Sequence, residues 1–480
     1  MVSGESNHEH ETTVPWWQPV VFAACAGGMA WGIRGQYGHE TGAMIAGLLV
    51  SLTLVLLLCP RASSRQVVRA VAWGTVAMGF GGSMTYGQTV GLTHNPEMVG
   101  HVGALMWGLA GLAIKGGLWI GFAGVFLGMG LSGVRYRPRQ MLWLMLGIVA
   151  AFVVGVLVFN SPFNPQEKSL PPVYFSADWR WQPGAELEPR HEWWGGLLVA
   201  LALTIAYAGW KRKDRLARNM ALWGILGGAL GFPLGQCLQA YHAWNPEIFQ
   251  QGIWQQLDPH MNWWNWMETT FGTIMGAALG LGLWLNRRSI APVAEDDEDR
   301  PAPGVPWAML AVHLVLLYFV EFHSVFVVDV VYDMGVVMGI LPMVAIAAGG
   351  WWPYAVVFPV TLMPIAGKTV VQLVYEEEAI GLAAGWLVYA VIPLLVAIGA
   401  AAWFYRMAGV GLSARALASR ALLLCTWLYF LLNYAFFRFP WPWAEWTGRT
   451  PNGIVFTLCT FALTGLAVYH LVQKQGEGAP

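Results

Sequence analysis

Residues Trp31 to Gly42 read WGIRGQYGHETG and separate two strongly apolar stretches of the chain. Four side chains in this segment are suited to a polar site: Arg34, Gln36, His39 and Glu40. Burying a charge beside apolar segments costs free energy unless the charge is paired, so these residues favour a functional role. The glycines and polar residues are equally typical of a turn between two helices, and this second interpretation stays open.

The composition places the chain among membrane proteins. Of its 480 residues, 56% are hydrophobic and only 11% are charged, whereas roughly a quarter of a typical soluble protein is charged. A net charge of -1 argues against a nucleic-acid partner, which usually meets a basic surface. The expected partners are therefore the lipid bilayer and a small-molecule solute.

Apolar runs of helical length recur along the whole chain, which predicts an all-α, polytopic transmembrane helical bundle. About fourteen spans are expected, within a range of about 12 to 14. They cover residues 16–33, 41–59, 67–84, 102–133, 141–159, 194–211, 219–240, 263–286, 304–322, 324–348, 354–374, 380–404, 421–438 and 453–471.

The distribution of Lys and Arg indicates how the bundle is oriented. Basic residues gather in every other loop, at 61–65, 135–139, 211–218, 287–288 and 406–420. The positive-inside rule makes these loops cytoplasmic and puts both termini inside, as in a bacterial cytoplasmic membrane. If residues 16–59 form one re-entrant element, the number of spans becomes odd and the N-terminus lies outside.

The chain divides at an acidic, proline-bearing segment that contains EDDEDR. The expected organisation is an N-terminal tail (1–15), a Gly-rich transmembrane half (16–288), an acidic cytoplasmic linker (289–306), a second transmembrane half (307–471) and a C-terminal tail (472–480). Glycines at small-xxx-small spacing in 117–133 and 272–280 predict helices that approach closely inside the bundle.

Residues 67–133 and 219–286 resemble each other at an offset of 150 positions. Trp73-Gly74 matches Trp223-Gly224, and Asn95-Pro96-Glu97 matches Asn245-Pro246-Glu247. Both copies run from inside to outside in the expected topology, so the pattern predicts a parallel internal repeat.

A Gln, a His and a carboxylate follow Trp-Gly in each copy and, in compressed form, in the opening segment. All of them are expected near the outer face, where they would form a polar ring that binds substrate. The candidate residues are Arg34, Gln36, His39, Glu40, Gln88, His94, Glu97, Gln236, His242 and Glu247. The alternative is that Asn-Pro-Glu serves only to end one helix and cap the next.

Two further charges fall within apolar spans. Lys115 and Glu268 occupy roughly corresponding places in the two copies, and we expect them to form an intramembrane charge pair. The alternative is that Glu268 lies at the level of the outer lipid headgroups, where a charge costs little free energy.

A candidate ion-coupling group lies in the second half of the chain. It comprises Glu321, His323, Asp329 and Asp333, with Lys368 as counter-charge. Asp329 and Asp333 are four residues apart, which places both on one helical face. A structural Asp–Lys bridge is an equal alternative.

Tryptophan is frequent, at 28 residues, and concentrates near the expected outer loops. Interfacial aromatic belts account for such a distribution. The long loop 160–193 interleaves Pro, Asp178, Arg180 and Trp, and would also suit a lid over an external site.

No phosphate-loop, zinc-protease or hydrolase motif is present, and neither a metal nor a cofactor is expected. Intramembrane charges, Gly-broken spans and a parallel repeat favour a transporter of a small polar solute, sugar-like or an organic acid, with protons or a cation as candidate coupling ions. The alternative is a membrane-embedded enzyme acting on a lipid-linked or periplasmic substrate, with His39 or His94 as base. A structural subunit with internally paired charges is a third interpretation.

Overall fold

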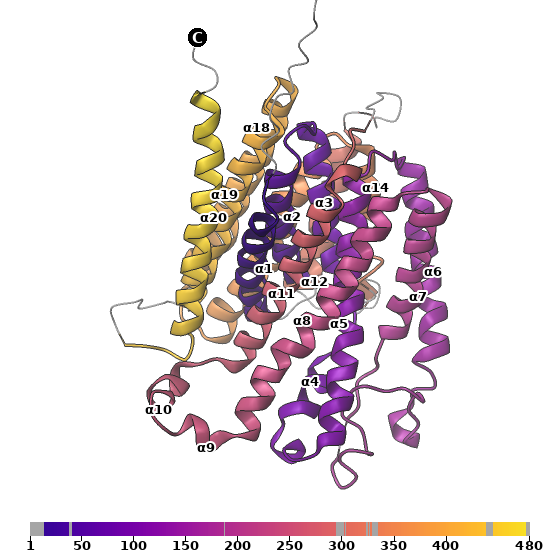
Figure 1. Ribbon diagram of the computed structural model, residues 1–480, viewed down its shortest axis with the longest axis vertical. Helices are drawn as coiled ribbons and strands as arrows, with labels where there is room; N and C mark the ends of the chain where they lie inside the picture. Colours follow the sequence, from indigo (N-terminus) through magenta and orange to yellow (C-terminus); the bar gives the residue numbers. More distant parts are fainter. Residues whose placement is uncertain are drawn as a thin grey trace, which may run out of the picture.

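The computed structural model describes residues 14–37, 41–186, 188–293, 304–322, 335–437 and 445–476, with isolated positions at 302, 325, 327 and 328. All regular secondary structure in these residues is helical, without a strand (Figure 1). The predicted all-α class is therefore confirmed.

The helices of the first half are α1 (Trp17–Tyr37), α2 (Met44–Leu58), α3 (Ser64–Phe80), α4 (Gly87–His94), α5 (Val102–Leu131), α6 (Pro138–Phe159), α7 (Trp194–Ala206), α8 (Arg215–Trp244), α9 (Pro246–Phe249), α10 (Trp254–Leu257) and α11 (Trp263–Leu285). Those of the second half are α12 (Val305–Phe322), α14 (Ile340–Ala348), α15 (Trp352–Ala355), α16 (Thr361–Val370), α17 (Leu382–Trp386), α18 (Ile392–Gly409), α19 (Ala414–Phe437) and α20 (Thr450–Gly476). Short π-helical turns continue α7 to Lys211, join α15 to α16, extend α16 to Glu376 and join α17 to α18.

Eight helical stretches in the described residues are long and apolar enough to cross a membrane. They are Val102–Leu131, Pro138–Phe159, Trp194–Lys211, Arg215–Trp244, Trp352–Glu376, Leu382–Gly409, Ala414–Ala435 and Thr450–Gln473. Met44–Leu58 and Val305–Val320 are shorter apolar helices. These lengths are consistent with an integral, multi-pass membrane protein, while fourteen spans and the internal repeat stay predictions.

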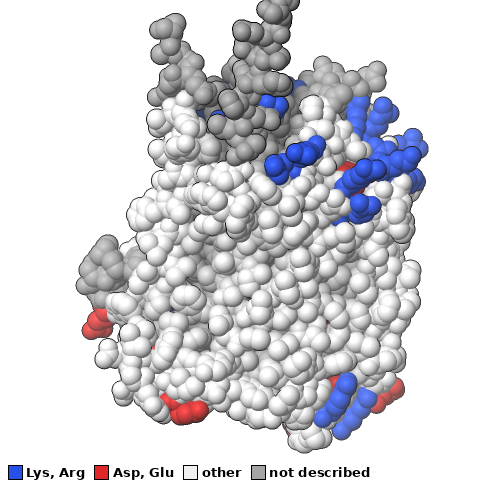
Figure 2. Space-filling view, viewed as in Figure 1, with Lys and Arg blue, Asp and Glu red and all other residues white. Residues whose placement is uncertain are grey.

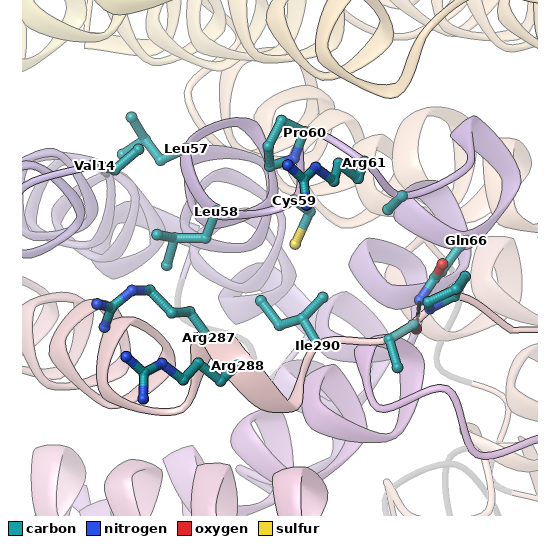
Figure 3. A pocket seen from close by; sticks show the side chains of 13 residues that line it. Val14, Leu57, Leu58, Cys59, Pro60, Arg61, Gln66, Arg287, Arg288 and Ile290 are labelled. Carbon is teal, nitrogen blue, oxygen red and sulfur yellow. Dashed lines mark hydrogen bonds between the residues drawn. The ribbon is translucent and has the colours of Figure 1, made fainter. Parts of the chain in front are cut away.

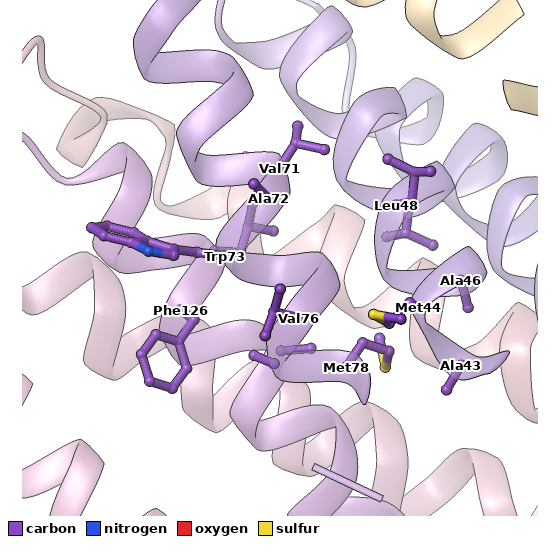
Figure 4. Close-up of a cluster of buried hydrophobic side chains, with 14 of the residues drawn as sticks. Ala43, Met44, Ala46, Leu48, Val71, Ala72, Trp73, Val76, Met78 and Phe126 are labelled. Carbon is purple, nitrogen blue, oxygen red and sulfur yellow. The ribbon is translucent and has the colours of Figure 1, made fainter. Parts of the chain in front are cut away.

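Helix α2 forms the centre of the bundle. All of its residues are buried, and α1, α3, α11 and α19 pack around it. Figure 4 shows part of this core, where Met44 of α2 lies near Met78 of α3. The uniformly apolar sequence of α2 suits this position, because a helix that is hydrophobic on every side needs protein or lipid all around it.

Glycines bring two pairs of long helices into backbone contact. A Cβ atom added to Gly228 of α8 would overlap the carbonyl of Gly116 in α5, and one on Gly272 of α11 would overlap the carbonyl of Gly27 in α1. The expected close helix approach is thus confirmed. It aligns α5, α8, α11 and α1 side by side, and this row carries the polar residues discussed below.

The helix expected over 67–84 ends early, and a second short helix follows it. Helix α3 ends at Phe80, residues 81–86 are non-helical, and α4 begins at Gly87. Gly82 leaves room for the Trp119 ring, which a Cβ atom would overlap. Non-helical backbone inside a membrane bundle is tolerated only where protein or a polar cavity surrounds it. We call residues 81–86 the unwound segment.

Basic residues gather at one end of the bundle (Figure 2), which we call the basic end. It includes the loops at 59–63, 131–137, 211–214 and 286–292, which contact one another through Ala291, Asp214 and Arg135. Val14 lies there too, because its carbonyl accepts a 2.8 Å hydrogen bond from Trp284 Nε1. Helix α20 also ends at this end (Figure 1), so both ends of the described chain lie on one side.

Candidate functional site

Arg34 is buried in the last turn of α1, with 1% of its surface exposed. Its Nη1 atom donates a 2.6 Å hydrogen bond to Tyr86 Oη and lies 3.5 Å from Glu268 Oε1. Three aromatic rings surround the guanidinium, with centroids 5.2 Å (Trp119), 5.6 Å (Tyr86) and 5.8 Å (Trp31) away. These cation–π contacts and the carboxylate compensate for the lost hydration of the charge.

Glu268 is held in the second turn of α11. Its Oε1 atom accepts a 3.1 Å hydrogen bond from Trp264 Nε1, and its Oε2 atom accepts a 3.4 Å bond from Asn265 Nδ2. The same Asn265 amide donates to the Gly32 carbonyl at 2.7 Å. A Cβ atom on Gly35 would overlap the Glu268 carboxylate. Gly32 and Gly35 of the WGIRG sequence therefore form the surface that receives these two α11 side chains.

Lys115 is fully buried in α5 and uses all three protons of its ammonium group. Its Nζ atom donates to Glu192 Oε1 at 2.5 Å, to the Thr85 carbonyl at 2.6 Å and to Thr89 Oγ1 at 2.8 Å. The Thr85 carbonyl is available because the chain is not helical there. The interruption before α4 thus supplies a ligand for the buried lysine.

Glu192 lies at the end of the 160–193 loop, with 1% of its surface exposed. Besides Lys115, its carboxylate accepts hydrogen bonds from Ser176 Oγ and from the Phe175 backbone N–H, both at 2.8 Å. The loop therefore places a carboxylate into the interior of the bundle and closes over Lys115.

The unwound segment joins these two ion pairs. Its adjacent residues Thr85 and Tyr86 contact Lys115 and Arg34, respectively. We call Arg34, Tyr86, Lys115, Glu192 and Glu268 the central polar cluster. It combines two buried cations, two buried carboxylates and a phenol around a helix break. Arg34 and Glu268 lie within about two turns of the helix ends opposite the basic end.

The predicted pairing of Lys115 with Glu268 is wrong. Each of the two charges has a different partner, Glu192 for Lys115 and Arg34 for Glu268. The prediction failed because it considered only charges within spans, whereas the lysine is neutralised from a loop.

The residues of the predicted polar ring lie in separate environments. Gln88 holds the 160–193 loop, since it donates to the Glu188 carbonyl and accepts from the Arg190 N–H, both at 3.2 Å. Gln236 is buried and donates to Thr93 Oγ1 at 2.6 Å. His94 Nδ1 lies 3.0 Å from the Val90 carbonyl of its own helix. These contacts do not join Gln88, Gln236 and His94 into one ring.

Glu97 and Glu247 are exposed, each in a short helical turn that begins at the proline of an Asn-Pro pair. Their position agrees with the turn interpretation of Asn-Pro-Glu. For Gln36 the backbone belongs to α1 and the side chain is outside the described residues, as are His39 and Glu40.

The ion-coupling candidates fall largely outside the described residues: His323, Asp329 and Asp333 entirely, and Glu321 by its side chain. Lys368 is half-buried in α16.

A second polar group lies at the end opposite the basic end. His242 Nε2 lies 2.9 Å from Asp258 Oδ1. The side chains of His242 and Asp258 are partly exposed, at 28% and 29%, respectively. Trp263 stacks on the His242 ring, with centroids 4.5 Å apart, and donates to Asp258 at 2.7 Å. The predicted residue His242 is therefore one half of a His–carboxylate pair.

Charges in the surrounding loops act on the cluster. Burial lowers the pKa of Arg449, in the loop before α20, while the negative charge of Glu268 opposes this shift. Burial raises the pKa of Tyr174 in the 160–193 loop, and the Glu192 carboxylate adds to the effect. Arg449 is thus a further cation near Glu268, in addition to Arg34, and it lies on the side away from the basic end.

Sequence reasoning missed Tyr86, Glu192 and Asn265. Glu192 directly precedes Trp193-Trp194-Gly195, the entrance to an apolar helix. A carboxylate at such a position is a candidate partner for a lysine in a neighbouring span, and this signal was available.

Comparison with protein-family models, with curated proteins and with solved structures finds no match for this chain.

Proposed function

We propose that the chain is a membrane transporter for a small polar solute and that the central polar cluster forms its solute site. The observation that carries the proposal is the interruption between α3 and α4, where consecutive residues contact two buried cations. Interrupted membrane helices near buried charges are a recurring feature of alternating-access transporters, because the freed backbone groups bind solute or ions.

The chemistry of the cluster favours a solute with a carboxylate or several hydroxyl groups. An organic acid would compete with Glu268 for Arg34, since both offer the same charged acceptor. A sugar-like solute would instead bond to Asn265 and Tyr86 and stack on the surrounding tryptophans. In either case the ion pairs form the closed arrangement that solute has to displace.

Several broader features belong to the same proposal. Fourteen spans would require six further segments to cross the bilayer besides the eight long apolar helices. Each of the two repeat segments has an Asn-Pro turn before a long glycine-bearing helix. The positive-inside rule would place the basic end and both termini in the cytoplasm of a bacterial cell, with the cluster nearer the outside. Asp329 and Asp333 would couple protons or a cation.

Uptake into proteoliposomes tests the proposal. The full chain is assayed with labelled organic acids, sugars and polyols, with and without a proton gradient. Tyr86→Phe removes the hydroxyl that accepts from Arg34 and should lower uptake at least tenfold while the protein stays folded. Tyr405→Phe, at an exposed tyrosine, is the matched control. No uptake across the panel would overturn the proposal.

A membrane-embedded enzyme is the second candidate, and the His242–Asp258 pair favours it. A carboxylate that orients a partly exposed histidine is a common arrangement for a general base. His242→Gln should then abolish turnover of an added lipid-linked or periplasmic substrate, while His260→Gln should not. If the chain takes up solute and His242→Gln leaves that uptake unchanged, the result would count against this candidate.

A further inference from the structure

A cavity of about 370 Å³ opens at the basic end, away from the central polar cluster. It lies between the end of α2, the start of α3 and residues 287–292 (Figure 3). Leu57, Leu58, Val14 and Ile290 form apolar walls, and three arginines provide the charge. The three are Arg61, Arg287 and Arg288.

The lining of this cavity is cationic. It contains three arginines and no Asp or Glu among its described residues. Arg287 is oriented by Trp284, since Nη1 donates to the Trp284 carbonyl at 2.8 Å and the guanidinium lies 4.1 Å from the ring centroid. A guanidinium has five N–H donors, so this single bond leaves most of them available.

Gln66 adds a polar acceptor. It lies near the start of α3, lines the cavity and is 1% exposed. Its Nε2 atom donates to the Ala291 carbonyl at 2.7 Å, which fixes the orientation of the amide because a carbonyl can only accept. Oε1 has no hydrogen-bond partner among the described residues. A buried acceptor without a donor is costly, and a ligand hydroxyl would satisfy it.

We propose that this cavity binds a phosphate ester that carries a free hydroxyl group. Arginine forks bind phosphate oxygens in pairs, and a phosphate group offers more acceptor oxygens to Arg287 and Arg288 than a carboxylate does. The hydroxyl accounts for Gln66, and the apolar walls accommodate carbon atoms of the ester. A soluble glycerol phosphate and the headgroup of phosphatidylglycerol share this chemistry. The proposal is independent of the transported solute.

The soluble source is tested by calorimetric titration of the full chain in phosphatidylcholine nanodiscs with glycerol 3-phosphate, inorganic phosphate and glycerol. Glycerol 3-phosphate should bind more tightly than inorganic phosphate, and glycerol should not bind. Arg288→Gln should weaken binding about tenfold and is tolerable for folding because the side chain is exposed. Arg139→Gln, another exposed arginine of the basic end, should leave binding unchanged.

The lipid source is tested by replacing part of the phosphatidylcholine with phosphatidylglycerol. A rise in melting temperature that Arg288→Gln reduces and Arg139→Gln does not would assign the cavity to the lipid headgroup. Gln66→Leu should remove the preference for glycerol 3-phosphate over inorganic phosphate. In the lipid experiment it should remove the preference for phosphatidylglycerol over phosphatidic acid. The proposal fails if neither source binds, or if both arginine variants weaken binding equally.

Discussion

Arg34 of α1 and Glu268 of α11 form an ion pair in the interior of the bundle, with Nη1 3.5 Å from Oε1 and both side chains at most 3% exposed. Removing one partner of a buried pair leaves the other charge without compensation, which is more damaging than removing both. The two residues are therefore expected to depend on each other both for stability and for uptake.

We expect Arg34→Gln to lower the free energy of unfolding by about 3 kcal/mol. The double variant Arg34→Gln/Glu268→Gln should be less destabilised than the sum of the single variants, by roughly 1–3 kcal/mol. Unfolding titrations in detergent measure these differences, and the uptake assay should show no activity for Arg34→Gln. Additive effects, or uptake retained without Arg34, would contradict the role given to the pair.

Gly35 is expected to tolerate no side chain, because a Cβ atom there would overlap the Glu268 carboxylate. Gly35→Ala should separate α1 from α11 locally, weaken the Arg34–Glu268 contact and reduce the yield of folded protein. Gly399→Ala is the matched control, since no atom lies within 4 Å of a Cβ atom at that helical position. The control should be neutral or stabilising by up to about 1 kcal/mol. The melting temperatures of Gly35→Ala and Gly399→Ala, measured in the same detergent, test this prediction.

The sequence was sufficient to predict the class of the fold. Apolar runs of helical length, the glycine spacing of α5 and α11, and the grouping of basic loops are local patterns. The helical class and the close approach of the glycine-bearing helices were predicted correctly because helix formation and close packing depend on neighbouring residues at fixed spacing. The orientation inferred from the basic loops stays a prediction.

The partners within the site were not predictable from local patterns. Arg34, Lys115 and Glu268 stood out as charges near or within apolar segments, but their contacts join residues far apart in the chain. Lys115 and Glu192 are 77 positions apart, and the carboxylate belongs to a loop. The early end of α3 at Phe80 was also missed, because Gly81-Gly82 in a glycine-rich bundle is equally compatible with a helix that continues to residue 84.

Lys115→Met is expected to loosen the 160–193 loop. The variant leaves Glu192 buried with only Ser176 and the Phe175 N–H as donors, so the carboxylate should move toward water and take the loop with it. Amide hydrogen exchange across 174–192 should accelerate at least tenfold, which corresponds to about 1.4 kcal/mol. Glu167→Gln, at an exposed carboxylate of the same loop, is the control. Unchanged exchange in Lys115→Met would show that the loop is held by other contacts.

Asp214 predicts a pH dependence at the basic end. It caps α8 by accepting from the Ala217 N–H at 2.8 Å, and it accepts from Ser132 Oγ at 2.6 Å and Tyr136 Oη at 2.8 Å. Burial nevertheless raises its pKa above the usual value of 3.8. The folded protein thus binds this proton more tightly than the unfolded chain does.

The stabilisation from that proton is complete below the unfolded pKa and is lost as the pH rises through the raised, folded value. Asp214→Asn imitates the protonated carboxyl and keeps an oxygen for the Ala217 N–H. Its melting temperature relative to the natural protein should therefore be higher at pH 7 than at about pH 4. Glu97→Gln, which removes an exposed carboxylate at the opposite end, is the control. The difference in melting temperature between Asp214→Asn and the natural protein could instead stay constant with pH or grow toward acid pH. Either result would mean that the hydrogen bonds to Asp214 outweigh its burial.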